Sequence, residues 1–323
     1  MLEYILFIFG FFFLLAGARY LIEGSSSFAK RMGLPPLIVG LTILAFGTSM
    51  PELVVTLVSA FRGSTELALG NIVGSNIANI LLVLGIGALI YPITVKSSTI
   101  WKEIPFGFLA AIVLFVVAND RLIDNGGITY SALTRIDGIV MLLFFVIFLV
   151  YIYELARKHH KKAFKEEVGM KYNNWSIIAL MMVSGMLGLY FGGKWIVDGA
   201  LAITSALGWS EFLVASTIIA VGTSLPELVT TIIAALNKEV DLAVGNLVGS
   251  NLFNIFYVLA LSAVISPIKL PPLINIDIIF LIFVSLLLFV YLFIGEKRKL
   301  HKWQGLAFLI LYVMYVVSVI IRG

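Results

Sequence analysis

The sequence predicts an all-α polytopic membrane protein with ten transmembrane helices, arranged as two inverted repeats of five. Composition is the first reason, because 61% of the 323 residues are hydrophobic and only 12% are charged. A soluble domain has about 25% charged residues and no apolar stretch near 20 residues. Here the mean hydropathy is +1.07, and such stretches recur along the whole chain. The second reason is an internal duplication that relates the two halves.

Ten apolar stretches have the length of about 20 residues that a helix needs to span a bilayer. They lie near residues 4–24, 37–61, 68–91, 101–119, 136–156, 175–197, 211–236, 243–265, 273–294 and 303–321. The first stretch has no basic start and no small-residue cleavage site, so we expect a retained helix and not a signal peptide. The chain has no cysteine, which excludes disulfides, thiolate metal ligands and thiol catalysis.

A shift of 175 positions aligns the two halves of the chain. It superposes GTSMPE at 47–52 on GTSLPE at 222–227. The same shift superposes GNIVGSNIANI at 70–80 on GNLVGSNLFNI at 245–255. One offset that serves separate segments indicates a duplicated unit.

Each half holds five of the expected spans. The predicted units are a first repeat at 1–156, a basic cytoplasmic linker at 157–174 and a second repeat at 175–323. Because five is odd, the second half enters the membrane from the opposite side, so the repeats are inverted. Inverted repeats are typical of transporters, whose substrate site lies near the midplane between the repeats. With both termini outside the cell membrane, the inner loops hold fifteen Lys and Arg residues and the outer segments five, as the positive-inside rule requires.

The hexapeptide at 47–52 places a proline and a glutamate inside an apolar span. Pro51 has no amide hydrogen and clashes with the Gly47 carbonyl, so we expect the helix to break there and to free the carbonyls nearby, from Ala45 onward. Non-helical backbone at this depth is tolerated where it lines a cavity. A carboxylate buried in a bilayer by default marks an ion path. Glu52 and Glu227 therefore predict one shared site made from two halves.

The groups near the two breaks are oxygen ligands, without imidazole or thiolate, which suits Na⁺ and Ca²⁺ better than zinc, copper or iron. The spans at 68–91 and 243–265 add a serine and an asparagine four positions apart, which share one helical face. The candidate metal ligands are the carbonyls of Ala45 and Ala220 and the side chains of Thr48, Ser49, Glu52, Ser75, Asn79, Thr223, Ser224, Glu227, Ser250 and Asn254.

Small residues in the same two spans predict close packing. Glycines four positions apart, at Gly70 and Gly74 and again at Gly245 and Gly249, let helices approach closely. This would bring both spans against the broken helices. Two further asparagines fit ligands and helix–helix hydrogen bonds equally well: Asn76 and Asn251. The two formal negative charges of the cluster match one divalent cation, two protons or two monovalent cations.

The paired strings GTSxPE and GNxxGSNxxN resemble the alpha repeats of the calcium/cation antiporter superfamily, and are closest to those of prokaryotic sodium/calcium exchangers. The likeness covers essentially the whole chain, with the alpha-1 motif at 40–80 and the alpha-2 motif at 215–255. It implies alternating access, in which Na⁺ flowing inward drives Ca²⁺ out. The first and sixth helices would slide across a static core of the other eight.

The resemblance also implies a role for each candidate ligand. Glu52 and Glu227 would be central ligands shared by Ca²⁺ and Na⁺, and Thr48 and Thr223 would assist Ca²⁺. Flanking Na⁺ sites would be completed by Ser49, Ser75, Ser224, Ser250 and the carbonyls of Ala45 and Ala220.

Asn79 and Asn254 would lie at the middle of the site. Some archaeal and potassium-dependent members of the superfamily carry aspartate where this chain has Asn254, so we do not expect K⁺ co-transport. Proton-coupled members carry roughly GNxxE in place of GTSxPE.

Simpler interpretations exist for several of these features. One GTSxPE alone fits a proline kink with a protonated glutamate, but a duplicated pair argues against it. The i, i+4 pairs Arg19/Glu23 and Lys194/Asp198 are expected at the membrane interface and not as ligands. The three histidines are expected to be solvated, and the basic linker anchors the inner face or contacts anionic lipid.

The leading hypothesis is an antiporter that exchanges Na⁺ for Ca²⁺ and normally extrudes Ca²⁺. A Ca²⁺/H⁺ antiporter is the nearest rival, although protons would not need the extra serine and threonine oxygens. A channel fits poorly, because channels repeat a filter around an axis through the membrane. No nucleophile-and-base motif suggests an enzyme. We expect no cofactor and no nucleic-acid partner, only the bilayer and the transported Na⁺ and Ca²⁺, and a monomer would suffice.

Overall fold

The computed structural model describes residues 2–120, 131–160, 172, 174–204, 219–270 and 273–322. Eight helices in these ranges are long and apolar enough to cross a membrane, and a bent pair makes up to nine. The prediction of an all-helical protein with many spans is confirmed. The first part of the span expected near 211–236, and most of the linker, lie outside the described residues.

The helices follow the expected spans, several of which are divided into shorter segments. In chain order they are α1 (Leu2–Met32), α2 (Pro36–Val39), α3 (Ala45–Thr48), α4 (Met50–Arg62), α5 (Thr65–Ala78), α6 (Leu84–Ile90), α7 (Ser97–Trp101), α8 (Glu103–Val117), α10 (Arg135–His160), α11 (Trp175–Thr204), α13 (Ala220–Thr223), α14 (Leu225–Leu236), α15 (Val240–Phe253), α16 (Ala260–Ile265), α17 (Ile274–Tyr291) and α18 (Lys302–Arg322). Short π-helical segments join some of them: η1 (Gly40–Leu44), η2 (Asn79–Val83) and η6 (Asn254–Leu259).

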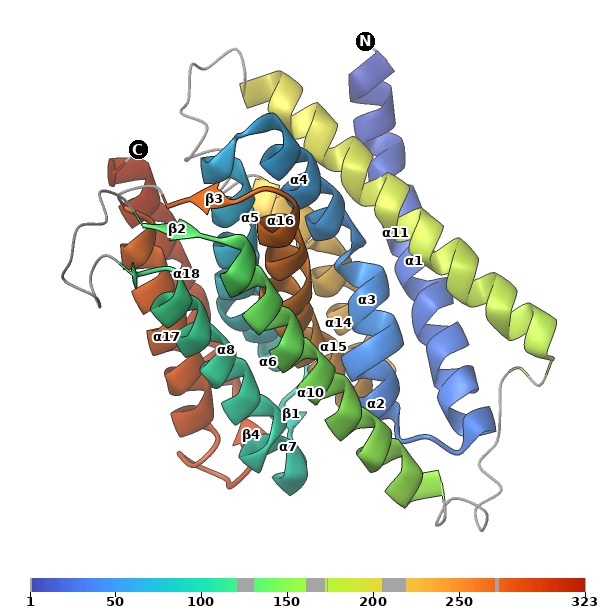
Figure 1. Cartoon of the computed structure of the whole chain (residues 1–323). Helices are drawn as coiled ribbons and strands as arrows, with labels where there is room; N and C mark the ends of the chain where they lie inside the picture. The colour runs from blue at the N-terminus through green and yellow to red at the C-terminus, as the bar shows by residue number, and fades with distance from the viewer. Residues whose placement is uncertain are drawn as a thin grey trace.

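The centre of the bundle consists of α5–η2–α6 and α15–η6–α16. Their membrane-spanning windows are 83% and 72% buried, against 22% for α10 at the surface. A helix that neighbours cover on every side is hydrophobic all round, which explains why these two segments are apolar with small residues. The helices α8, α10, α17 and α18 lie around this centre on one side (Figure 1). The two GNxxGSNxxN strings are thus in the interior.

α1 and α11 are the longest helices in the described part, with 31 and 30 residues, and lie side by side at one edge of the bundle (Figure 1). Glycines let their backbones touch. A Cβ added to Gly17 would lie 2.7 Å from the Leu189 amide nitrogen, and one added to Gly185 would lie 2.6 Å from the Leu21 amide nitrogen. α1 and α11 are therefore packed at backbone distance, and we call them the interlocked pair.

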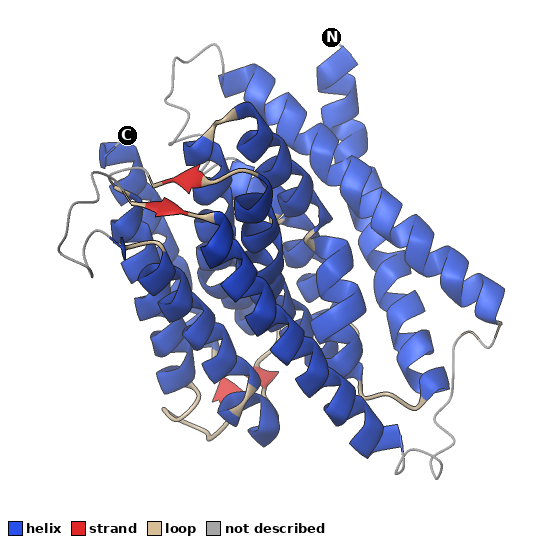
Figure 2. Cartoon of the chain, viewed as in Figure 1, coloured by secondary structure: helices blue, strands red, loops and turns tan. Residues whose placement is uncertain are grey.

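Four two-residue strands, which the sequence did not predict, join loops at the two ends of the bundle (Figure 2). β1 (Ile93–Thr94) pairs antiparallel with β4 (Lys299–Leu300), and β2 (Ala132–Leu133) pairs with β3 (Ile268–Lys269). Each pair connects a loop of the first half to a loop of the second. The strand pairs therefore hold the two halves together outside the helical core.

The helices before α5 and α15 end in the same turn, with different residues at the critical position. Gly63 after α4 has φ 75°, the left-handed conformation that glycine adopts without steric cost. In the other half, Lys238 occupies the aligned position with φ 61°. Its amide bonds the Ala235 carbonyl at 3.1 Å, just as the Gly63 amide bonds the Ala60 carbonyl at 3.2 Å. Lysine therefore carries a strain that glycine would not.

We expect Lys238→Gly to stabilise the protein. A left-handed residue with a Cβ costs about 1–2 kcal/mol, offset in part by the greater chain entropy of glycine in the unfolded state. The net gain should be about 0.5–1 kcal/mol, measured by thermal unfolding in detergent. The reciprocal Gly63→Lys should lower the unfolding temperature, and a drop for Lys238→Gly would contradict the strain.

Candidate ion-binding site

The first helix break lies at Ser49, between α3 and α4. Ser49 has φ −82° and ψ 9°, outside the helical region, and Pro51 follows in the first turn of α4. The two helical segments on either side, Pro36–Thr48 and Met50–Arg62, are bent by 47°. Glu52 consequently lies in the first turn of a helix, where the helix dipole stabilises a negative charge.

The second break has the same local structure. Ser224, with φ −81° and ψ 1°, separates α13 from α14, and Pro226 and Glu227 stand in the first turn of α14. The repeated hexapeptide therefore produces a repeated conformation. Each break places one glutamate at the start of a helix inside the bundle.

The expectation that the breaks free the alanine carbonyls is wrong in part. The Ala45 carbonyl accepts the Ser49 amide at 3.0 Å, and the Ala220 carbonyl accepts the Ser224 amide at 3.1 Å. The reason is spacing, since the amide that Pro51 lacks would have bonded residue 47 and not residue 45. A carbonyl oxygen has a second lone pair, so both alanine carbonyls can still accept a further contact.

α15 packs against α2 and η1 at backbone distance. A Cβ added to Gly245 would lie 2.6 Å from the Leu37 carbonyl oxygen, and one added to Gly249 would lie 2.8 Å from the Leu41 carbonyl oxygen. The predicted close approach is confirmed for these two glycines. It brings the polar face of α15 to the end of α3.

A cluster of oxygens forms where α3 meets α15. Thr48 Oγ1 lies 3.0 Å from Asn246 Oδ1, 3.2 Å from Ser250 Oγ and 3.3 Å from the Ala45 carbonyl oxygen. Thr48, Asn246 and Ser250 are fully buried. One carbonyl and two hydroxyl groups, drawn from both halves of the chain, are thus gathered beside the first break.

A matching cluster forms where α13 meets α5. Thr223 Oγ1 lies 3.1 Å from Asn71 Oδ1, 3.1 Å from Ser75 Oγ and 3.3 Å from the Ala220 carbonyl oxygen. The Ser75 hydroxyl also lies 3.3 Å from the Ala220 carbonyl oxygen. The structure thereby brings together the predicted Thr, Ser and Ala groups at each break.

The two glutamates differ in their hydrogen bonds. Glu227 Oε1 accepts the Ser250 hydroxyl at 3.1 Å and the Ser49 hydroxyl at 3.3 Å. Glu52 lies close enough to Glu227 for their charges to interact and is near the hydroxyls of Thr223 and Ser75, yet neither of its carboxylate oxygens has a hydrogen bond of good geometry among the described residues. Both side chains are 0% exposed. Two neighbouring carboxylates without a cation repel each other.

Four asparagines join the two central helices in reciprocal pairs. Asn79 Nδ2 donates to Asn251 Oδ1 at 3.0 Å, and Asn254 Nδ2 donates to Asn76 Oδ1 at 3.1 Å. The Nδ2 atoms of Asn76 and Asn251 each donate to the other's backbone carbonyl at 3.5 Å. Asn76 and Asn251 therefore use both polar ends between helices. Asn79 and Asn254 use only their nitrogens in this way.

Asn79 and Asn254 also begin the π-helical segments η2 and η6. A π-turn is frequent at functional sites, because the extra residue changes the direction of neighbouring side chains. η2 contacts α14 and η6 contacts α4. Each asparagine is consequently placed at the junction with the helix that begins at the other half's break.

Several unpartnered acceptor oxygens lie together in this region. In the described part of the chain, Glu52 Oε1 and Oε2, Glu227 Oε2, Asn79 Oδ1 and Asn254 Oδ1 have no hydrogen-bond partner. Ser224 Oγ is likewise without one there. A buried acceptor left unpaired costs about 1–3 kcal/mol, and more when it is charged. A cation held among these oxygens would satisfy them, because carboxylate and amide oxygens are ligands of hard cations.

Sequence reasoning gave no role to Asn71 and Asn246, which the structure places in direct contact with the site threonines. Both are 0% exposed. Both stand at the same place in the repeated GNxxGSN string, which marks them as duplicated but does not distinguish them from helix-packing asparagines.

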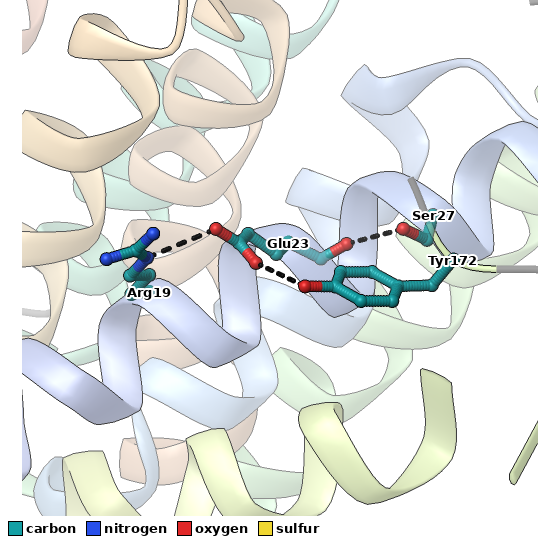
Figure 3. A network of polar contacts seen from close by, with 4 residues as sticks. All are labelled: Arg19, Glu23, Ser27 and Tyr172. Atoms are coloured by element: carbon teal, nitrogen blue, oxygen red, sulfur yellow. Dashed lines mark hydrogen bonds and ion pairs between the residues drawn. The ribbon is translucent and has the colours of Figure 1, made fainter. Parts of the chain in front are cut away.

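The Arg19/Glu23 pair lies on α1 in a small polar network with Ser27 and Tyr172 (Figure 3). Arg19 Nε donates to Glu23 Oε1 at 3.2 Å, and the Tyr172 hydroxyl donates to Glu23 Oε2 at 3.2 Å. The Arg19 side chain is 69% exposed. Lys194 and Asp198 form the equivalent pair on α11 at 3.2 Å. The location of both pairs at the membrane interface stays a prediction.

Comparison with known proteins identifies the family. The model of the sodium/calcium exchanger protein family matches residues 2–154 and 177–321. Inner membrane protein YrbG of Escherichia coli is 35% identical over 83% of this chain and 81% of its own. Sodium/calcium exchanger MaX1 of Methanosarcina acetivorans is 26% identical over 98% of this chain and 97% of its own. A solved structure of the sodium-calcium exchanger NCX_Mj, soaked with Na⁺ and Sr²⁺, has a TM-score of 0.81 at 29% identity and covers 98% of both chains. The chain therefore belongs to the sodium/calcium exchanger protein family of multi-pass membrane cation antiporters.

Proposed function

We propose that this protein exchanges Na⁺ for Ca²⁺ across the cell membrane by alternating access, with Glu52 and Glu227 as the shared central ligands. The observation that carries the proposal is the group of buried acceptor oxygens at Glu52, Glu227, Asn79 and Asn254 that find no donor among the residues the structure describes. Two carboxylates neutralise one Ca²⁺, and Ca²⁺ accepts six to eight oxygen ligands in flexible geometry. Unpaired carboxylates in a membrane interior are otherwise costly.

Na⁺ is favoured over H⁺ as the coupling ion by the two flanking clusters. Each combines an alanine carbonyl with two hydroxyl groups, at Ala45, Thr48 and Ser250 or at Ala220, Thr223 and Ser75. A bound proton needs one oxygen, whereas Na⁺ needs several hard oxygens around it. Ser49 and Ser224, the residues at the breaks, complete the proposed set.

The proposed architecture has ten spans in two inverted repeats, 1–156 and 175–323, with both termini outside. The repeated breaks at Ser49 and Ser224 and the reciprocal contacts between halves support it. The interlocked pair α1–α11 is the element proposed to slide. Its contact with the first break at Gly47 is with a side chain that can adapt. The three nearest atoms to a Cβ on Gly47 in the described part of the chain belong to Met186, the nearest at 3.0 Å, and methionine adapts its shape readily.

The test is uptake of radioactive calcium into proteoliposomes loaded with Na⁺ and diluted into Na⁺-free buffer at clamped pH. We expect uptake that requires the Na⁺ gradient and stops when Na⁺ is equal on both sides. Uptake that ignores Na⁺ but follows a pH gradient would instead assign the protein as a Ca²⁺/H⁺ antiporter.

A further inference from the structure

We infer that Asn246 and Asn71 are positioning residues for the transported cation, although neither touches the carboxylates. Each accepts the hydroxyl proton of a threonine in the opposite half, Thr48 or Thr223. In doing so it keeps the oxygen lone pairs of that threonine and of the neighbouring alanine carbonyl available to the cation. The inference rests on the proposed function, since it concerns the flanking clusters of that site.

The orientation of the Asn246 amide is fixed by a chain of hydrogen bonds. The Thr230 hydroxyl has one proton. It donates this proton to the Pro226 carbonyl at 2.7 Å, and the Glu227 backbone carbonyl lies nearby as a second acceptor at 3.0 Å. Thr230 Oγ1 can then only accept from Asn246, whose Nδ2 lies 3.1 Å away. The Asn246 oxygen must consequently point the other way, toward Thr48.

Thr48 has one proton and a choice of acceptors. Asn246 Oδ1 is nearest at 3.0 Å, followed by Ser250 Oγ at 3.2 Å and the Ala45 carbonyl at 3.3 Å. The Ser250 hydroxyl donates to Glu227. With Asn246 present, the Thr48 hydroxyl proton points toward the Asn246 oxygen. The Ala45 carbonyl and the Ser250 hydroxyl oxygen then keep their lone pairs for the cation. Without Asn246, the proton turns to Ala45, to Ser250 or to the nearby Glu227 carboxylate, and occupies an oxygen that the cation would use.

The first half reaches the same arrangement with a different partner. Asn71 Nδ2 donates to Thr56 Oγ1 at 3.0 Å, and its Oδ1 accepts Thr223 at 3.1 Å. Thr56 aligns with Thr231 under the 175-residue shift, whereas Thr230 aligns with Val55. The threonine that accepts the asparagine Nδ2 therefore stands one position apart in the two halves. The side-chain amides of Asn71 and Asn246 nevertheless have the same orientation. Orientation of the asparagine oxygen is the shared feature.

The experiment compares Asn246→Leu with Asn119→Leu, a matched loss of a buried amide. Asn119 is 0% exposed and exchanges hydrogen bonds with Asn275, at 3.0 and 2.6 Å, outside the site. We expect Asn246→Leu to raise the Na⁺ concentration for half-maximal exchange by roughly tenfold, with a smaller change in the maximal rate. Asn119→Leu should leave that concentration unchanged. Equal effects of both variants would overturn the inference.

A double-mutant cycle shows whether Asn246 acts through Thr48. If it does, Asn246→Leu should add nothing to the loss that Thr48→Val already causes, because contacting residues are not additive. Additive losses would overturn the inference. The Asn71→Leu and Thr223→Val cycle makes the same test if Asn246→Leu does not fold. Measuring both cycles on Ca²⁺ affinity by calorimetry tests the asparagines even if wild type proves not to be coupled to Na⁺, which would contradict only the proposed function.

Discussion

Glu52→Gln and Glu227→Gln are each expected to abolish Na⁺-driven Ca²⁺ uptake. Glutamine keeps the size of the side chain but removes one of the two charges that would neutralise Ca²⁺. Leaving one buried charge without its partner costs about 3–5 kcal/mol, which is more than two orders of magnitude in affinity at about 1.4 kcal/mol per factor of ten. Calcium uptake into proteoliposomes and calorimetric Ca²⁺ binding both measure the loss.

Glu103→Gln is the matched control for these two variants. Glu103, in α8, is 1% exposed and accepts the Tyr151 hydroxyl, and its Oε2 has no partner among the described residues. It resembles Glu52 in burial but lies outside the proposed site, so its variant should still transport. Glu52→Gln should also remain folded in buffer without Na⁺ or Ca²⁺, because it removes the repulsion between two neighbouring buried carboxylates. Exchange at the wild-type rate in either site variant would remove the basis of the two-glutamate site.

Gly245→Ala is expected to destabilise the protein by about 2–3 kcal/mol, the range of overpacking in a tight core. The added Cβ would lie 2.6 Å from the Leu37 carbonyl oxygen and 3.1 Å from Gly40 Cα and from the Leu41 amide nitrogen. All three are backbone atoms, which cannot rotate away as a side chain can. α15 must move off η1, and Asn246 and Thr48 separate with it. Exchange should be lost together with thermal stability.

The same substitution in α8 should have the opposite effect. A Cβ added to Gly107 meets nothing within 4 Å in the described part of the chain. Alanine in a helix is more favourable than glycine by about 0.5–1 kcal/mol, so Gly107→Ala should raise the unfolding temperature and leave exchange intact. Thermal unfolding in detergent measures both variants. A Gly245→Ala protein as stable as Gly107→Ala would show that α15 and η1 are not held at backbone distance.

Much of this site could be predicted because its chemistry is local and duplicated. Pro51 and Pro226 dictate a break wherever they fall in a helix, and the glutamates one residue later inherit positions at a helix start. The spacing of Gly245 and Gly249 similarly predicts that the helix they belong to packs closely against a neighbouring helix. A single alignment offset then implied that the two breaks meet.

The features that could not be predicted depend on the other half of the chain. Asn71 and Asn246 matter through threonines about 150 and 200 positions away in sequence, and only their contacts in the fold separate them from ordinary helix-packing asparagines. The π-helical segments that begin at Asn79 and Asn254 contact α14 and α4 of the opposite half, and no local residue pattern predicted them. The strands β1–β4 are too short to leave a pattern in sequence.

The cross-half bonding of the threonines bears on how the protein is made. Thr48 is held by Asn246 and Ser250, which the ribosome adds some 200 residues after it. A nascent first half therefore enters the bilayer with Thr48 and Asn79 still lacking their partners from the second half, and polar groups in lipid must be satisfied within the protein. Closure of the proposed ion site thus belongs to the last stage of biogenesis. Two separately encoded halves should regain Ca²⁺ binding only when they are inserted into the same membrane together.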